Sequence, residues 1–154
     1  MKVKKRILIA LAGVMVLGMS GTKSVPMMAS ETGDPDFMIS IPAELTIQKS
    51  GWDEVGEIIM RMPPSKYIKI KTDKEWGNGK LVNKDDTTKI IPYQLRYQPF
   101  PGANLQPFGT GEFHSSTEYR ITIHVNVEEY SNMPPGIYED IVTFTAYLME
   151  QPQA

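Results

Sequence analysis

The segment that decides the fold lies near the C-terminus, at Met133–Met149, and reads MPPGIYEDIVTFTAYLM. It opens with two prolines and a glycine, which mark a turn before regular structure begins. From Val142 to Leu148 apolar residues then alternate with more polar ones, which is the period of a strand that buries one face. The segment predicts a tight turn that leads into a long two-faced strand.

The same period of two recurs along the chain, and no long stretch after residue 29 shows the period of a helix. Residues 54–62 fit a short helix or a strand equally well. Clusters of glycine and proline, among them Gly77-Asn78-Gly79, separate the alternating stretches as strand breakers. The expected buried faces are those of Phe37, Ile39 and Ile41; Ile68 and Ile70; Ile91, Tyr93, Leu95 and Tyr97; Tyr119, Ile121, Ile123, Val125 and Val127; and Val142, Phe144, Ala146 and Leu148.

Half-buried strands of this number and length are typical of two packed antiparallel sheets. We therefore predict an all-β fold, an immunoglobulin-like antiparallel β-sandwich of seven to eight strands over residues 37–150, with a small open barrel as the alternative. One stretch, Gln98–Gly111, breaks the pattern with three prolines and three glycines. It predicts an ordered but irregular loop, and a loop of this length in a compact domain tends to be functional or mobile.

The N-terminus has the pattern of a secretory signal peptide. Four basic residues precede the apolar run Ile7–Met19, whose 13 residues are too few for a transmembrane helix of about 20. We predict a signal peptide over residues 1–29, cleaved after Ala29, with Ser24 as a second option and an uncleaved anchor as the alternative. Residues 30–36 then form a flexible lead, and residues 151–154 form a tail.

Removal of residues 1–29 changes the charge of the protein. These residues hold five of the 16 basic groups and no acidic one, so 11 basic and 18 acidic residues remain, a net charge of −7. A domain of this sign gains little from counterion release on a phosphate backbone. Nucleic acid and an anionic membrane surface are therefore poor candidate partners for the mature protein.

The chain contains no cysteine. This excludes a disulfide framework, a thiolate zinc site, a cysteine nucleophile and a lipid anchor on cysteine. Small secreted eukaryotic domains usually have disulfides, so their absence favours a bacterial source. The mature length suits one domain that can bury a core without cross-links.

Neither a catalytic set nor a metal site emerges from the sequence. The two histidines, His114 and His124, have no recognisable ligand set beside them, and a metal site needs several converging ligands. Asp85 and Asp86 fit a turn. A serine nucleophile would need an activating base, and Ser115 beside His114 is better explained as part of a loop. We expect no catalytic residue, no metal and no cofactor, and hence not an enzyme.

Several aromatic residues lie in or beside the predicted turns. On the rim of a sandwich such side chains can stack on sugar rings or bury in a partner, or they can close the ends of the core. The candidate binding residues are Trp52, Trp76, Phe100 and Phe108.

The turn before the last strand has its own physical interpretation. Gly136 can adopt backbone angles that other residues avoid. Tyr138 can insert its ring at the corner while its hydroxyl bonds to the backbone, as in a tyrosine corner. Together with Asp140 these residues are the expected structural turn.

A resemblance to a known family rests on IPYQLRY at 91–97, on FMISIPAELTI at 37–47 and on the string Gly136, Tyr138, Asp140, Val142 and Phe144. Together these stretches, about a third of the mature chain, resemble spore coat protein U and the fimbrial-subunit-like group of exported bacterial β-sandwiches. The resemblance implies a closing hairpin with a Pro/Gly turn, a tyrosine, an aspartate and a long final strand. Proteins of that group commonly pair cysteines, and this chain has none, so the resemblance implies fold and export more than pilus assembly.

The leading hypothesis is a non-enzymatic structural or adhesive subunit, secreted or at the bacterial cell surface. If it assembles as fimbrial subunits do, one copy completes the sheet of the next by strand addition. Residues 30–41 are the donor candidate, with Phe37, Ile39 and Ile41 as the inserted side chains, although this strand can also pair within its own domain. The alternative is a secreted monomeric β-sandwich module that binds carbohydrate or protein. The partner is then the chain itself or a surface glycan or protein.

Overall fold

The computed structural model describes residues 2–11, 24–28, 38–109, 111–114, 118–130 and 132–150 of the 154 residues. The predicted cleavage point at Ala29, the lead at 30–36 and the tail at 151–154 lie outside them. The described strands are β1 (Lys2–Leu11), β2 (Ser24–Met28), β3 (Met38–Pro42), β4 (Glu44–Ile47), β5 (Gly51–Arg61), β6 (Lys66–Thr72), β7 (Asn78–Asn83), β8 (Ile90–Gln98), β9 (Tyr119–Val127) and β10 (Tyr138–Glu150).

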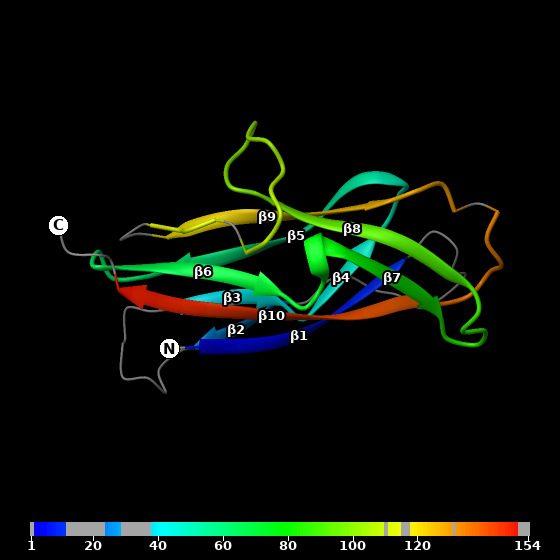
Figure 1. Ribbon diagram of the computed structural model, residues 1–154, viewed down its shortest axis with the longest axis horizontal. Coiled ribbons are helices and arrows are strands. Elements are labelled where there is room, and N and C mark those ends of the chain that lie inside the picture. The colour runs from blue at the N-terminus through cyan, green and yellow to red at the C-terminus, as the bar shows by residue number, and fades with distance from the viewer. Residues whose placement is uncertain are drawn as a thin grey trace.

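The strands form one sheet that folds over on itself, in the order β2-β3-β5-β9-β8-β7-β10-β1-β4, with β6 paired to β10. Every pair is antiparallel except β1 with β4. In Figure 1, β8 and β9 run above β6 and β10. The predicted all-β, immunoglobulin-like sandwich is confirmed, and eight of the described strands, β3 to β10, follow residue 29.

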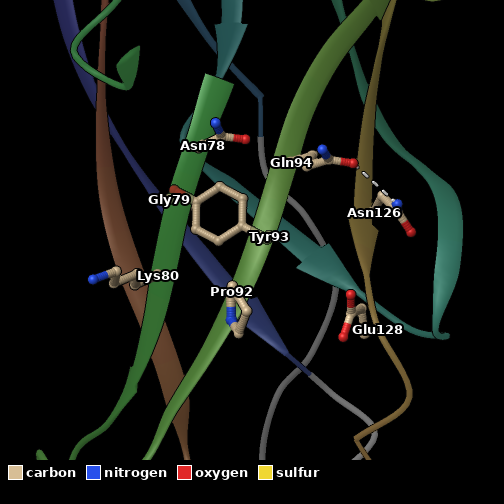
Figure 2. Close-up of a pocket in the computed structure, with 8 residues that line it drawn as sticks. All are labelled: Asn78, Gly79, Lys80, Pro92, Tyr93, Gln94, Asn126 and Glu128. Carbon is tan, nitrogen blue, oxygen red and sulfur yellow. Dashed lines mark hydrogen bonds between the residues drawn. The ribbon is translucent and has the colours of Figure 1, made fainter. Parts of the chain in front are cut away.

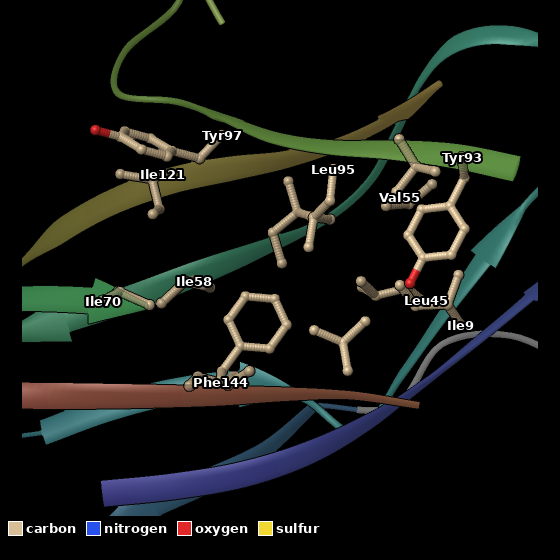
Figure 3. Close-up of a cluster of buried hydrophobic side chains, with 14 of the residues drawn as sticks. Ile9, Leu45, Val55, Ile58, Ile70, Tyr93, Leu95, Tyr97, Ile121 and Phe144 are labelled. Atoms are coloured by element: carbon tan, nitrogen blue, oxygen red, sulfur yellow. The ribbon is translucent and has the colours of Figure 1, made fainter. Parts of the chain in front are cut away.

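The core lies between the two layers and is built by the predicted alternation. Leu95, Ile121 and Ile58 come from β8, β9 and β5, and Figure 3 shows them facing Phe144 of β10 and Ile70 of β6. Residues 54–62, which fitted a helix or a strand, lie mainly in β5. A bulge between Glu54 and Gly56 interrupts its pairing with β9, which explains why the alternation is unclear there.

One predicted breaker is partly a strand. Gly77 does turn the chain with a φ of +74°, but β7 begins directly after it and includes Gly79. Gly79 pairs with Tyr93 of β8, and a Cβ at this position would collide with the ring of Tyr93. The glycine therefore makes room for an aromatic side chain on the neighbouring strand, and it does not end the strand.

The turn before β10 has the geometry of a tyrosine corner. Tyr138 is fully buried, and its hydroxyl donates a hydrogen bond of 2.7 Å to the carbonyl oxygen of Pro134. Gly136 has a φ of +155°, and a Cβ there would lie 2.6 Å from the side-chain nitrogen of Asn83. A residue other than glycine would therefore disturb both the turn and the end of β7.

The irregular loop after β8 folds back onto the sandwich. Tyr97 and Gln106 exchange two backbone hydrogen bonds of 2.9 and 2.8 Å, and the side chain of Gln98 donates to the carbonyl oxygen of Ala103 at 2.8 Å. Further along, Phe113 forms an isolated bridge with Ile68 of β6. The loop is thus tied to both layers.

In the full chain the N-terminal segment, which was predicted to be a cleaved leader, takes part in the sheet. Residues Lys2–Leu11 form β1, which pairs with β10 along its whole length and with β4 in parallel. Ile9 is completely buried, and Figure 3 shows it beside Leu45 and Tyr93. A leader and a half-buried strand both contain several apolar residues, and burial stabilises either of them. Composition alone therefore does not distinguish a leader from a strand.

Replacing Tyr138 by phenylalanine should lower the free energy of unfolding by about 0.5–1.5 kcal/mol, because the variant loses one part-buried hydrogen bond and keeps the ring. Urea unfolding followed by circular dichroism measures this difference. Tyr119→Phe is the matched control, since among the described residues the Tyr119 hydroxyl has no hydrogen-bond partner. Equal losses in the two variants would contradict the role assigned to the Tyr138 hydroxyl.

Candidate functional site

A row of polar and aromatic side chains crosses four strands on the outer face of the sheet. In register, Trp52 of β5 lies opposite Asn126 of β9, Asn126 lies opposite Gln94 of β8, and Gln94 lies opposite Asn78 of β7. The strand neighbours of Asn126 and of Gln94 are buried on the other face. These four residues, here called the outer row, therefore point away from the core.

Three residues of the outer row, Asn78, Gln94 and Asn126, border a hollow of about 340 Å³. Figure 2 shows the hydrogen bond across it, in which the Asn126 side-chain amide donates to the Gln94 side-chain oxygen at 3.2 Å. Both signs of charge are present at its edge, since one lining residue is a lysine and another a glutamate. The side chains around it are Asn78, Lys80, Pro92, Gln94, Asn126 and Glu128.

Tyr93 connects this hollow to the interior. Its hydroxyl donates a hydrogen bond of 2.6 Å to a carboxylate oxygen of Asp140 on β10, and Lys74 forms a salt bridge of 3.0 Å with the same oxygen. Burial, and next the hydrogen bond to Asp140, raise the pKa of the Tyr93 phenol far above its usual value. The three side chains tie β8 to the start of β10 beneath the outer row.

The four predicted aromatic candidates have different environments. Trp52, Trp76 and Phe100 are 40%, 72% and 61% exposed. Phe108 instead packs on Tyr97 and Phe144, with ring centroids 5.1 and 5.2 Å apart, so it closes the end of the core.

Of these aromatics, the register places only Trp52 in the outer row. Trp76 lies in a 3₁₀ turn at Glu75–Gly77, two residues before Asn78. Its backbone is left-handed, with a φ of 54°, and its carbonyl oxygen accepts a hydrogen bond of 2.8 Å from Arg96. Phe100 lies on the loop after β8.

The predicted donor strand is used within its own domain. Ile39 and Ile41 are completely buried in β3, which pairs with β5. Phe37 lies outside the described residues. The strand between β10 and β4 is β1, from the predicted leader.

The two histidines lie in separate settings. His124 is on the outer face of β9 with its ring 2.9 Å from the Thr122 hydroxyl, and His114 stacks on Tyr67 with centroids 4.8 Å apart. In the described part of the chain, no three histidine or acidic side chains gather closely enough to hold a metal ion. Nor does any helix in that part have the length and apolar character to cross a membrane.

Sequence reasoning missed the amides of the outer row. Gln94 and Asn126 were recognised as polar members of alternating strands, and Asn78 was assigned to a breaker. Their juxtaposition depends on the register of three strand pairs, which one sequence does not contain. The available signal was weaker: an amide stands between two buried residues in each of β8 and β9.

The Tyr93 network should make the protein sensitive to alkali. The tyrosine pKa is about 10 in an unfolded chain and higher in the folded protein, so the stabilisation is complete below pH 10 and is lost as pH rises above it. Each such tyrosine contributes a slope of about −1.4 kcal/mol per pH unit in that range. Urea unfolding between pH 9 and 11.5 should give a shallower decline for Tyr93→Phe than for the unsubstituted chain. Identical slopes would rule out this role for Tyr93.

No protein-family profile and no curated protein matches the chain. Two solved structures are similar to it. The AfaE-3 adhesin from Escherichia coli is 12% identical, with a TM-score of 0.45, over 96% of this chain and 94% of that one. The DraE adhesin in complex with chloramphenicol succinate is 13% identical, with a TM-score of 0.46, over 99% of this chain and 96% of that one. Both proteins similar in structure are named as adhesins, whereas the likeness to spore coat protein U stays a prediction.

Proposed function

We propose that the chain is an exported bacterial surface protein, a non-enzymatic structural or adhesive subunit that is secreted or held at the cell surface. Residues 1–29 act in this proposal as a cleaved signal peptide. The mature domain then completes its sheet with a strand from a second copy of the chain.

The observation behind the proposal is the place of β1. This strand comes from the predicted leader, and it pairs with β10 through ten residues, Lys2 to Leu11. Among the described strands β4 has β1 as its one pairing partner. Cleavage would therefore leave β10 paired only with β6 and β7, and β4 with no partner in the sheet.

An opening of this kind favours strand addition. Unpaired backbone groups at a sheet edge are a template for another chain, and an extended peptide can add itself there through main-chain hydrogen bonds. The loss of Ile9 would also empty a fully buried position, and burying such a side chain contributes about 1.5–3 kcal/mol. An added strand with an apolar residue at this position would restore both the main-chain hydrogen bonds and the buried apolar contact.

The donor candidate at residues 30–41 needs a rearrangement. Because Ile39 and Ile41 are buried beside β5, a copy could donate this segment only by releasing β3 from its own sheet. Such an exchange of an identical element between copies is a known route to assembly.

Assembly by strand addition should be detectable by gel electrophoresis. When surface extracts of the native host are run in detergent without boiling and probed by immunoblot, we expect a ladder of multimers that collapses on boiling. Mass spectrometry of the collapsed band should place its N-terminus at Ser30. A single monomer band without boiling would refute strand-exchanged assembly, and an intact Met1 would refute the leader.

A peptide competition makes the test specific for the position of β1. The peptide KVKKRILIAL, residues 2–11, should prevent the ladder from reforming after the boiled subunits are cooled and refolded. The same peptide with Ile9→Asp is the matched control and should not, because it would place a charge in the core. Equal effects of the two peptides would exclude the gap between β10 and β4 as the acceptor.

The second candidate function is a secreted monomeric module that binds carbohydrate or protein. The exposure of Trp52 and Trp76 favours it, since large aromatic side chains at a surface serve as contacts for ligands. The two functions are compatible, because a subunit can assemble through one edge and bind a ligand on another face.

A further inference from the structure

We propose that the outer row is a binding site for a neutral carbohydrate, with a short glycan lying across β5, β9, β8 and β7. This inference gives the adhesive form of the proposed function its class of ligand. It needs a single chain only, because all four residues of the row come from one sheet.

The chemistry of the amides matches sugar hydroxyls. A carboxamide offers two donors and an oxygen with two lone pairs, and a hydroxyl group both donates and accepts. The bond from Asn126 to Gln94 uses one donor and one acceptor of this set. The row therefore keeps both kinds of hydrogen-bonding capacity for a polyhydroxylated ligand.

The amides are also held in place before a ligand arrives. Asn78, Gln94 and Asn126 stand on the paired strands β7, β8 and β9, and the Gln94–Asn126 bond restricts both side chains. Sites on strands keep a more exact geometry than sites on loops. Little side-chain entropy would then be lost on binding, which favours affinity.

Trp52 supplies the apolar contact that hydroxyl-binding amides lack. It is 40% exposed and lies directly opposite Asn126 at one end of the row. A sugar ring has apolar C–H groups on its face, and an exposed indole offers a large flat surface for them. An aromatic residue beside several amides can thus contact both the apolar face of a sugar ring and its hydroxyl groups.

The charges around the hollow favour a neutral ligand. Lys80 and Glu128 line it with opposite signs. Arg96 lies two positions along β8 from Gln94, and one of its guanidinium nitrogens donates to the carbonyl oxygens of Trp76 and Leu95 at 2.8 and 2.9 Å. The charges of Lys80 and Glu128 cancel, so the lining of the hollow offers a sialylated or sulfated chain no net positive charge, and Arg96 directs its guanidinium group to backbone oxygens.

The dimensions favour an extended ligand over a single small molecule. The hollow has a volume of about 340 Å³, near the lower end of the usual range of ligand sites. Trp52 and Asn78 are three strand spacings apart, which is about 14 Å. Contact with the whole row therefore needs more than one sugar ring.

The test applies the purified full chain to an array of neutral oligosaccharides ending in glucose, galactose, mannose or N-acetylglucosamine, with sialylated glycans and heparin alongside. We expect at least one neutral glycan to bind. Trp52→Ala and Gln94→Ala should each weaken that binding by about tenfold or more, since each removes one principal contact. Phe100→Ala is the matched control, because it removes an exposed aromatic side chain away from the row, and should change binding by less than about twofold.

Three results would overturn the proposal: no neutral glycan binds, only sialylated glycans or heparin bind, or the Trp52 and Gln94 variants bind like the unsubstituted chain. If a variant fails to fold, nuclear magnetic resonance of the unsubstituted chain tests whether the glycan contacts the row. The Trp52 indole signal should then shift on titration with the bound glycan, and an unmoved signal would place the ligand elsewhere. If the unboiled gels show no multimer ladder, the glycan-binding results are still expected. Strand addition and glycan binding can therefore be refuted separately.

Discussion

The structure depends on β10 having hydrogen-bonding partners on both of its edges. On one edge it pairs with β7 at its start and with β6 further along, and on the other it pairs with β1. Its inward residues, including Phe144, fill the core between the layers. Since β10 joins the two halves of the folded sheet, the strand on its second edge closes the domain, and in the proposed assembly a neighbouring copy would supply that strand.

The same sheet keeps the proposed assembly edge apart from the proposed binding face. Strand exchange would use backbone groups at the gap between β10 and β4, whereas the outer row uses side chains on β5, β9, β8 and β7. The Tyr93–Asp140–Lys74 network lies between these regions and ties β8 to β10. A filled edge and an occupied outer face can therefore exist in the same molecule without competing for residues.

The sequence was sufficient to predict the strands, because the alternation of apolar and polar residues is visible within each strand and burial of one face requires it. It was insufficient for whatever depends on register or on tertiary contacts. Phe100 and Phe108 each follow a proline in the same loop, yet Phe100 is exposed and Phe108 packs on Phe144. Gly79 looked like a turn residue because its partner, the ring of Tyr93, is 14 positions away in the chain. Likewise, the amides of the outer row become neighbours only once three strand pairs are aligned.

The position of β10 in the chain has a consequence for the order of folding. This strand is the last of the described strands in chain order, and it pairs with strands that begin as far back as Lys2 and Lys66. Contacts of such long sequence separation are slow to form, because the closure of a long loop must come first. The core around Phe144 can therefore close only after β10 has been synthesised. A core that closes this late would suit the export that we propose for the chain.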